Sequence, residues 1–276
     1  MIKSTVGHVE IRKMDSDKFV DSEDQLAIEE PLEIQLSYHA EGERIIKNIS
    51  VTMRTPGNDE ELAVGFLFTE GIIQNSNQVE AIKTDPFQEN TLLVSLFDDV
   101  EPVLQKTERN FYTTSSCGVC GKSSIDAIRT VSVFRNEEDE ICLPAELFYG
   151  LPDKIKKQQH LFESTGGLHA ATLFDLDGNF VRLREDVGRH NALDKLIGEA
   201  LLGYRLPLHT SILLLSGRAS FELVQKSIMA GIKIIAAVGA PSSLAVHLAK
   251  EAGITLIGFL RKERFNIYSA WQRVRL

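Results

Sequence analysis

The chain has 276 residues, of which 43% are hydrophobic and 25% charged, the balance of a globular protein with a sizeable core. Its formal net charge of −9 argues against broad binding to nucleic acid or anionic membranes, which needs a positive field. Its apolar runs are short and residues 1–10 are charged, so neither a membrane span nor a signal peptide is expected. The sequence therefore predicts a cytoplasmic protein that binds neither nucleic acid nor membrane.

Residues 1–108 are predicted to form a small α+β domain. Within residues 1–30 the only strand-like piece is 8–13. Asn58 stands where a helix N-cap is expected, Glu61 follows three residues later, and the helix should stop at Gly71. The remaining expected strands are 32–38 and 45–53, paired as a hairpin, then 79–83 and 91–96. An acidic stretch at 97–107 marks the domain boundary.

Residues 109–276 are predicted to form an α/β domain. Helices are expected at 122–134 and 145–162, the second interrupted at Gly150 and Pro152. A hairpin of strands 168–174 and 179–184 surrounds the turn pair Asp177-Gly178. From residue 211 onward, strands 211–215, 232–238 and 254–259 alternate with helices 219–230 and 243–252. This alternation predicts a largely parallel sheet with both faces covered, and a fold class of α/β, or α+β overall.

Cys117 and Cys120 form a close pair in the Gly/Ser-rich loop 115–121, and Cys142 stands alone. Three cysteines in a reducing compartment do not make a structural disulfide framework. A structural zinc site needs four Cys or His ligands in recognisable spacing, and no second Cys-x-x-Cys is present, so no metal is expected. A thioredoxin-like redox pair should directly follow an early strand, whereas this pair follows a domain boundary.

A reactive thiolate is the use of this pair that the local residues favour. Gly118 and Gly121 leave both sulfurs accessible. A helix that begins near Gly121 would favour a thiolate through its dipole, and Lys122 adds a positive charge. An exposed thiolate of low pKa is suited to sulfur or acyl transfer.

Two similar motifs do not match. The run Gly121-Lys122-Ser123 resembles the end of a P-loop, but Ser116 occupies the place of its first glycine. Zinc nucleobase deaminases carry His-x-Glu followed by Pro-Cys-x-x-Cys. Here the order is reversed, and His169 is followed by two alanines. The general acid/base of deaminase chemistry is therefore missing.

The loop 117–121, Cys-Gly-Val-Cys-Gly, resembles the signature of the FdhD family of formate dehydrogenase accessory sulfurtransferases. The likeness covers most of the chain, in family order. The other runs that carry it are RTPGNDEELA at 54–63, STGGLHAA at 164–171, REDVGRHNA at 184–192, SGRASFE at 216–222 and GFLR at 258–261.

The resemblance implies a small N-terminal domain, a cytidine-deaminase-like three-layer α/β domain and a homodimer. It also implies that sulfur passes from a cysteine desulfurase to molybdenum bis(molybdopterin guanine dinucleotide), for which guanine nucleotides are candidate mimics. The sulfurated cofactor then enters the catalytic subunit of formate dehydrogenase. By analogy Cys117 bears the persulfide and Cys120 assists as the second catalytic residue.

Such a cofactor needs anion sites, and the strand ends supply candidates. Residues 239–243 form a second strand-to-helix turn like 216–220. His169 is expected to be a core or edge residue, and the less favoured alternative is that it lines the pocket. Arg189 is expected either to bind phosphate, as its neighbour His190 could, or to pair with Asp186. The residues assigned to the cofactor are Ser216, Gly217, Arg218, Arg189, His190, Phe259, Leu260, Arg261, Lys262, Glu263 and Arg264.

Each of these sites also has a purely structural interpretation. Turns are rich in Gly and Ser because turns need them, although a bare turn does not require Arg218. A C-terminal basic run such as 261–264 is commonly a solvated tail. Three functions remain in competition: a sulfurtransferase, a non-catalytic chaperone that binds the molybdenum cofactor for formate dehydrogenase, and a zinc-dependent hydrolase on a deaminase-like fold.

Overall fold

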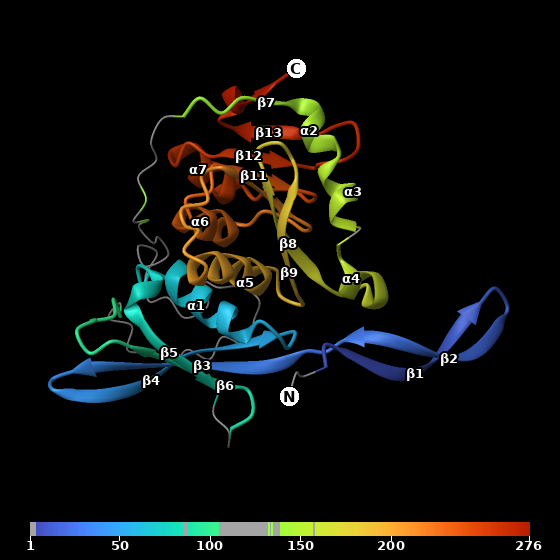
Figure 1. Cartoon of the computed structure of the whole chain (residues 1–276). Helices are drawn as coiled ribbons and strands as arrows, with labels where there is room; N and C mark the ends of the chain where they lie inside the picture. Colours follow the sequence, from blue (N-terminus) through green and yellow to red (C-terminus); the bar gives the residue numbers. More distant parts are fainter. Residues whose placement is uncertain (1–3, 85–87, 105–131, 133, 135–138, 157) are drawn as a thin grey trace.

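The computed structural model describes residues 4–84, 88–104, 132, 134, 139–156 and 158–276. Two sheets lie on opposite sides of a layer of helices (Figure 1), and one contiguous apolar core joins residues of both sheets and of these helices. The expected mixed α/β architecture is confirmed. Within these ranges, no helix is both long and apolar enough to cross a membrane.

The first sheet contains the predicted strands of the N-terminal half in the order β4-β3-β6-β5. Alternate residues of β3 (Leu32, Ile34 and Leu36) are buried against α1 and the core, because successive side chains of a strand point to opposite faces. The antiparallel hairpin of β3 and β4 is confirmed. The elements are β3 (Glu30–Ala40), β4 (Glu43–Arg54), α1 (Asp59–Thr69), β5 (Val79–Thr84) and β6 (Thr91–Leu96).

The second sheet has six strands in the order β13-β12-β11-β10-β8-β9. The three strands predicted from residue 211 onward, β10, β11 and β12, do run parallel to one another, and antiparallel strands that this prediction did not include extend the sheet on both sides. The β8–β9 hairpin joins β10 antiparallel, and β13 returns beside β12 after a connection too short for a parallel crossover. The strands are β8 (His169–Asp175), β9 (Phe180–Asp186), β10 (Ser211–Leu215), β11 (Ile234–Ala237), β12 (Thr255–Gly258) and β13 (Asn266–Ser269).

Helices cover both faces of this sheet, which confirms the three-layer arrangement. One face packs on α5 (Arg189–Leu202), α6 (Phe221–Met229) and α7 (Ser243–Glu251). The other face packs on Phe148, Leu151 and Ile155 in a separate apolar cluster. These residues belong to α2 (Ala145–Tyr149) and α3 (Leu151–Lys156). With α4 (His160–Thr165), these helices occupy the helical region predicted at 145–162, and the chain is interrupted at Gly150 as expected.

Helices α1 and α5 pack side by side and join the two halves of the structure (Figure 1). Their backbones approach at two glycines. A Cβ atom on Gly65 would lie 2.0 Å from the carbonyl oxygen of Asp194, and one on Gly198 would lie 1.9 Å from that of Glu61. Only glycine permits this approach, so the two helices are fixed in their register.

A long hairpin of β1 (Val6–Asp15) and β2 (Lys18–Ala27) extends away from the rest of the molecule (Figure 1). The predicted strand at 8–13 is confirmed, and its partner β2 was missed. Most side chains of β2 are exposed, so β2 lacks the alternation of apolar and polar residues that identifies a half-buried strand.

Two other local predictions have mixed outcomes. Asn58 does precede α1, but it adopts a left-handed conformation, its φ being 56°, and makes no capping hydrogen bond through its side chain, so the expected capping box does not form. The helix ends at Thr69 with Gly71 in a left-handed conformation, as expected. Short elements complete the fold: η1 (Ser76–Gln78), β7 (Leu143–Pro144), η3 (Trp271–Arg273) and β14 (Val274–Arg275).

The predicted domain boundary between residues 108 and 109 lies outside the described residues and stays a prediction. The same holds for most of the helix predicted at 122–134, of which Ser132 and Phe134 are described and are not helical.

Candidate functional site

The candidate site lies at one edge of the six-stranded sheet. The carboxyl ends of β10, β11 and β12 meet there, where ligands of open α/β sheets bind. Because β8 runs antiparallel to β10 and β9 antiparallel to β8, the start of β8 and the end of β9 reach the same edge. His169 and Asp186 face each other in the register of these two strands.

The loops at this edge touch through their backbones. A Cβ atom on Gly217 would lie 3.3 Å from Nδ1 of His169, and one on Gly239 would lie 2.9 Å from Cα of Arg218. The amide of Gly239 donates to the carbonyl of Gly217 at 2.8 Å, and the amide of Phe259 donates to the carbonyl of Gly239 at 3.0 Å. The strand-end segments predicted to bind the cofactor are therefore contiguous, and His169 lies next to them.

The loop after β10 is held to β8 and to the start of α5. The hydroxyl of Ser216 accepts a hydrogen bond from the amide of Ala170 at 2.8 Å. Nε2 of His190 lies 3.3 Å from the hydroxyl of Ser220 and 3.3 Å from a carboxylate oxygen of Glu222. His190 lowers the pKa of Glu222 to about 2. Both contacts use the same ring nitrogen, so these residues do not form a catalytic triad, in which the two nitrogens have separate partners.

His169 experiences a positive environment. Burial lowers the pKa of His169, and the charges of Arg189, His190 and Arg218 lower it further, against the opposing effect of Asp186. The imidazole is therefore uncharged at neutral pH. The sequence left His169 between core and pocket, and the structure places it at the candidate site, half-buried.

Arg189 does not pair with Asp186, which was one of the two alternatives that the sequence left open. A carboxylate oxygen of Asp186 instead lies 2.7 Å from Nζ of Lys195. Nε of Arg189 is buried and has no hydrogen-bond partner among the described residues. The binding of an anion by Arg189 stays a prediction.

The last predicted segment has an exposed ring and a buried anchor. Phe259 is 44% exposed and holds a left-handed conformation with φ of 54°. Leu260 is 1% exposed and packs in the apolar cluster beneath the sheet, so its side chain faces the core and only its backbone is near the edge.

The charged residues of this segment are exposed. A guanidinium nitrogen of Arg261 donates to the carbonyl of Val238 at 2.7 Å, and the amide of Arg261 donates to the carbonyl of Arg264 at 2.9 Å. The ammonium of Lys262 lies 3.4 Å from Asp153. Arg261 is thus fixed beside the loop after β11, while Glu263 and Arg264 extend from the turn.

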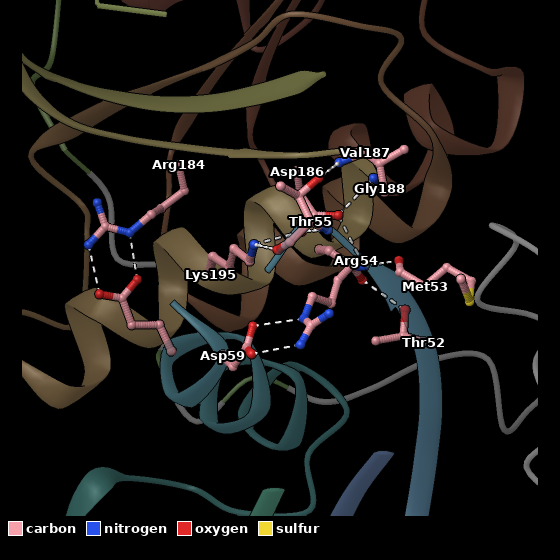
Figure 2. Close-up of polar contacts among 12 residues, drawn as sticks. Thr52, Met53, Arg54, Thr55, Asp59, Arg184, Asp186, Val187, Gly188 and Lys195 are labelled. Carbon is pink, nitrogen blue, oxygen red and sulfur yellow. Dashed lines mark hydrogen bonds and ion pairs between the residues drawn. The ribbon is translucent and has the colours of Figure 1, made fainter. Parts of the chain in front are cut away.

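A buried polar network supports this edge from below (Figure 2). Asp186 accepts hydrogen bonds from the amide of Thr55 at 3.2 Å and from the amide of Gly188 at 2.8 Å. Lys195 donates to the carbonyl of Thr55 at 2.8 Å. Gly188 is the N-cap of α5, so the network fixes the turn from which Arg189 and His190 project. This network was not predicted from the sequence, although a lysine among the buried apolar residues of α5 is a signal of such pairing.

Residues of two runs that carried the family resemblance bind each other across the two halves of the structure. The guanidinium of Arg184 contacts both carboxylate oxygens of Glu61, one of them at 2.7 Å. Arg54 is 1% exposed and binds both carboxylate oxygens of Asp59 at 2.9 Å. These members of the runs hold the fold together beneath the site.

Cys117 and Cys120 lie outside the described residues, and Cys142 is exposed. The described chain on either side of this segment contacts the same region. The amide of Val103 donates to the carbonyl of Ile72 at 3.1 Å, and the ring of Phe134 lies 6.5 Å from that of Phe68 in α1. Among the described residues there is no group of three or more His, Cys, Asp or Glu side chains arranged to hold a metal ion.

Comparisons with known proteins identify relatives along nearly the whole chain. The model of the FdhD/NarQ family matches residues 27–275. The protein named sulfur carrier protein FdhD from Mycolicibacterium paratuberculosis is 51% identical over 257 residues, which cover 90% of this chain and 91% of the relative. The protein of the same name from Sulfolobus acidocaldarius is 41% identical over 97% of this chain and 100% of its own length.

A solved structure shares the fold. The crystal structure of a formate dehydrogenase accessory protein from Desulfotalea psychrophila matches with a TM-score of 0.75 and 25% sequence identity. The match covers 99% of this chain and 100% of the other.

Proposed function

Because the chain belongs to the FdhD/NarQ family, we propose that it is a sulfur carrier that takes persulfide sulfur from a cysteine desulfurase and delivers it to a molybdenum cofactor. The acceptor is molybdenum bis(molybdopterin guanine dinucleotide), which then enters the catalytic subunit of a formate dehydrogenase. The relatives named sulfur carrier protein and the accessory protein of known structure support this assignment. Cys117 bears the sulfur, and Cys120 assists in its release.

The observation that carries the proposal is a cluster of cationic side chains at one sheet edge of an acidic protein. The net charge is −9, yet the charges of Arg189 and Arg218 both act on His169 at this edge, where Gly217 approaches the imidazole. A local positive site in a negative protein indicates a specific anionic ligand rather than general attraction to polyanions. The phosphates of a guanine dinucleotide fit that description.

The residues proposed to hold the cofactor divide between two neighbouring parts of the edge. Ser216, Gly217 and Arg218, with Arg189 and His190, face the phosphates. In the segment 259–264, the exposed ring of Phe259 offers a face on which guanine can stack. Arg261, Lys262 and Arg264 supply further charge, Leu260 and Glu263 contribute through their backbone, and a guanine nucleotide should occupy the same site.

The covalent length of the chain allows Cys117 to reach this edge. Helix α1 is about 16 Å long, and it leads from the region of Val103 and Phe134 to Thr55 beneath the site. A fully extended chain from Leu104 to Cys117 spans about 45 Å.

With both cysteines, the atoms and electrons of the sulfur transfer balance. The thiolate of Cys117 attacks the outer sulfur of the desulfurase persulfide, and the desulfurase thiolate leaves. That sulfur needs two electrons to be delivered as sulfide. The thiolate of Cys120 attacks the inner sulfur of the Cys117 persulfide, hydrosulfide leaves toward the cofactor, and a Cys117–Cys120 disulfide forms. A cellular dithiol then reduces the disulfide.

Mass spectrometry of the peptide that contains both cysteines tests this function. After incubation with a cysteine desulfurase and cysteine, Cys117 should gain about 32 Da, the mass of one sulfur atom. Cys117→Ala should show no such adduct and should not support formate dehydrogenase maturation. Cys120→Ala should keep the adduct and still fail to support maturation. The absence of an adduct together with normal maturation by Cys117→Ala would refute the proposal.

A different result in this experiment would favour a non-catalytic chaperone. In that case the protein with both cysteines replaced by alanine would bind the cofactor and still support maturation. We also propose that the carrier acts in the cytoplasm as a homodimer, and the mass of the purified protein measured by light scattering tests the dimer.

A further inference from the structure

We propose that the hairpin of β1 and β2, here called the arm, joins two copies of this chain, with strand β1 of one copy pairing antiparallel with β1 of the other. The two arms then form one four-stranded sheet in the order β2-β1-β1-β2, with a two-fold axis at Ile11. The inference rests on the homodimer of the proposed function, because it names the surface through which the two copies meet.

The isolation of the arm is the first observation. Strands β1 and β2 pair with each other along ten residues, and within the described ranges neither pairs with another strand. The arm projects away from both larger sheets (Figure 1). A lone two-stranded hairpin is at best marginally stable in water, and stability needs a third strand or a covering element. The arm therefore lacks a neighbour along most of its length.

The outer edge of β1 is the second observation. An edge strand presents a row of unpaired amides and carbonyls, which native proteins protect with a proline, a bulge or a covering segment. Strand β1 contains no proline, and its register with β2 has no bulge. Helix α4 contacts the arm through β2. The edge of β1 is thus suited to accept a strand from another chain.

The charges on the arm are the third observation. Glu10 lies directly opposite Glu23 in the register of the two strands, and like charges in this position are destabilising. Glu23 contacts Nδ1 of His8 at 2.5 Å, whereas the described part of the chain offers Glu10 no cation. Nε of Arg12 donates to Asp21 at 2.7 Å, and its guanidinium has further donors. Glu10 therefore lacks a cation that a strand beside β1 could supply.

Charge complementarity identifies a second copy as the source of that strand. With the two-fold axis at Ile11, Glu10 of each copy lies directly opposite Arg12 of the other, and the two Ile11 side chains meet at the axis. Opposite charges and aliphatic side chains in such cross-strand positions stabilise a sheet. Moving the axis by one residue to either side would place Glu10 opposite Glu10 or Arg12 opposite Arg12. The sequence of β1 thus favours one register.

The outer edge of β2 does not have this complementarity. Strand β2 carries Asp21, Glu23 and Asp24. With an axis at Ser22, Asp21 of one copy would lie opposite Glu23 of the other, so the pairing would bring acids together. Association through β1 is therefore the arrangement that the charges of the arm support.

Sedimentation equilibrium of the full-length protein over a range of concentrations tests the arm. The wild type should be a dimer. Glu10→Arg would place two arginines opposite each other, and Arg12→Glu would place two glutamates opposite each other. Because two cross-strand pairs change from attraction to repulsion, each variant alone should dimerise about 10- to 100-fold more weakly.

Mixing the two variants separates contact between copies from damage within one arm. In the mixed dimer, positions 10 and 12 of one chain face the opposite charge at positions 12 and 10 of the other. The mixture should therefore associate about as tightly as the wild type, and native mass spectrometry should identify the mixed dimer by its mass. Damage within one arm, such as the lost contact of Arg12 with Asp21, would not be repaired by mixing.

Glu23→Arg is the matched control. It makes the same change of charge directly opposite Glu10 within the arm, but on the strand that lies away from the second copy. This variant should remain a dimer. The arm is refuted as the interface if the wild type is a monomer, if Glu10→Arg and Arg12→Glu dimerise as the wild type does, or if the two variants fail to associate when mixed.

Persulfide formation on Cys117 in the same samples distinguishes the arm from the sulfur-carrier function. A wild type that forms the adduct, together with variants that all remain dimers, overturns only the arm. A wild type that forms no adduct, together with association restored by mixing, overturns only the sulfur-carrier function.

Discussion

Asp186 and Lys195 form an ion pair of 2.7 Å in which the side chains are 0% and 2% exposed. The pair lies directly below the turn that positions Arg189 and His190, since Asp186 also accepts a hydrogen bond from the amide of Gly188. Burial raises the pKa of Asp186, while Lys195 and the hydrogen bonds oppose that effect. The turn that carries the site is therefore supported by a buried ion pair in which each charge stabilises the other.

Removal of Lys195 should be strongly destabilising, because it leaves the carboxylate of Asp186 buried without its cation. We expect Lys195→Met to lower the free energy of unfolding by about 3–5 kcal/mol, measured by urea denaturation. The double variant Asp186→Asn/Lys195→Met should recover part of this loss. As a control, Arg12→Ala breaks a pair with Asp21 whose side chains are 66% and 74% exposed, and it should change stability by less than about 1 kcal/mol. Equal effects of the two single changes would contradict a structural role for the buried pair.

The crossing of α1 and α5 gives a second prediction. Alanine normally stabilises a helix by about 1 kcal/mol relative to glycine, but a Cβ on Gly65 would lie 2.0 Å from a carbonyl oxygen of α5, which is backbone and cannot rotate away. We expect Gly65→Ala and Gly198→Ala each to lower the free energy of unfolding by more than about 2 kcal/mol, since the helices must separate.

Gly150→Ala is the matched control for these changes. The nearest atom to a Cβ on Gly150 is a carbonyl oxygen at 4.0 Å, so this variant should be close to the wild type in stability. If all three glycine variants unfold at the same urea concentration, the close approach of α1 and α5 does not constrain the fold.

The parts of the fold that the sequence predicts well are those with a clear period. Leu32, Ile34 and Leu36 alternate with polar residues and do form a strand with one buried face. The turn pair Asp177-Gly178 does connect an antiparallel hairpin. Such elements can be read from local spacing because each places its apolar residues on one side.

The parts that were missed depend on contacts between distant segments. No local pattern shows that Asp186 would bind Lys195 rather than Arg189. Thr55, which lies more than a hundred residues away in the sequence, contacts both members of the pair. Residues 259–264 were likewise predicted to bind the cofactor as one segment. The structure turns Leu260 into the core while Phe259 and Arg261 stay at the edge.

Asp139 gives a third prediction. Its carboxylate binds the guanidinium of Arg273 at 2.9 Å and the ammonium of Lys233 at 2.8 Å, and these two contacts hold the pKa of Asp139 well below its ordinary value of 3.8, with Arg273 the larger cause. Because the folded pKa is depressed, the stability from Asp139 is present above pH 3.8 and is lost as the pH falls toward the folded pKa.

Asp139→Asn should therefore lower the free energy of unfolding at neutral pH by about 3 kcal/mol, since it leaves the buried Arg273 without its anion. The difference between variant and wild type should shrink as the pH falls below about 4. Urea denaturation at several pH values measures both effects. A difference that is constant across this range would show that the carboxylate charge is not responsible.

The last prediction concerns the pH dependence of nucleotide binding through His169. The pKa of this imidazole in the free protein is below its ordinary value of 6.5. A bound phosphate would favour the protonated form, so its pKa should rise in the complex, and protons should be taken up on binding. The affinity for GDP should therefore gain a favourable contribution as the pH falls from about 8 to about 6.

The phosphate of the ligand titrates in the same range, and its effect must be separated from that of His169. The terminal phosphate itself loses charge near pH 6, which weakens binding at acid pH. His190 lies between Ser220 and Glu222 and can be tested by His190→Gln. In His169→Gln the phosphate effect should remain alone, so its GDP affinity should fall more steeply toward pH 6 than that of the wild type. Titrations in buffers of different ionisation enthalpy would measure the proton uptake directly, and uptake that persists in His169→Gln but disappears in His190→Gln would assign the effect to the other histidine.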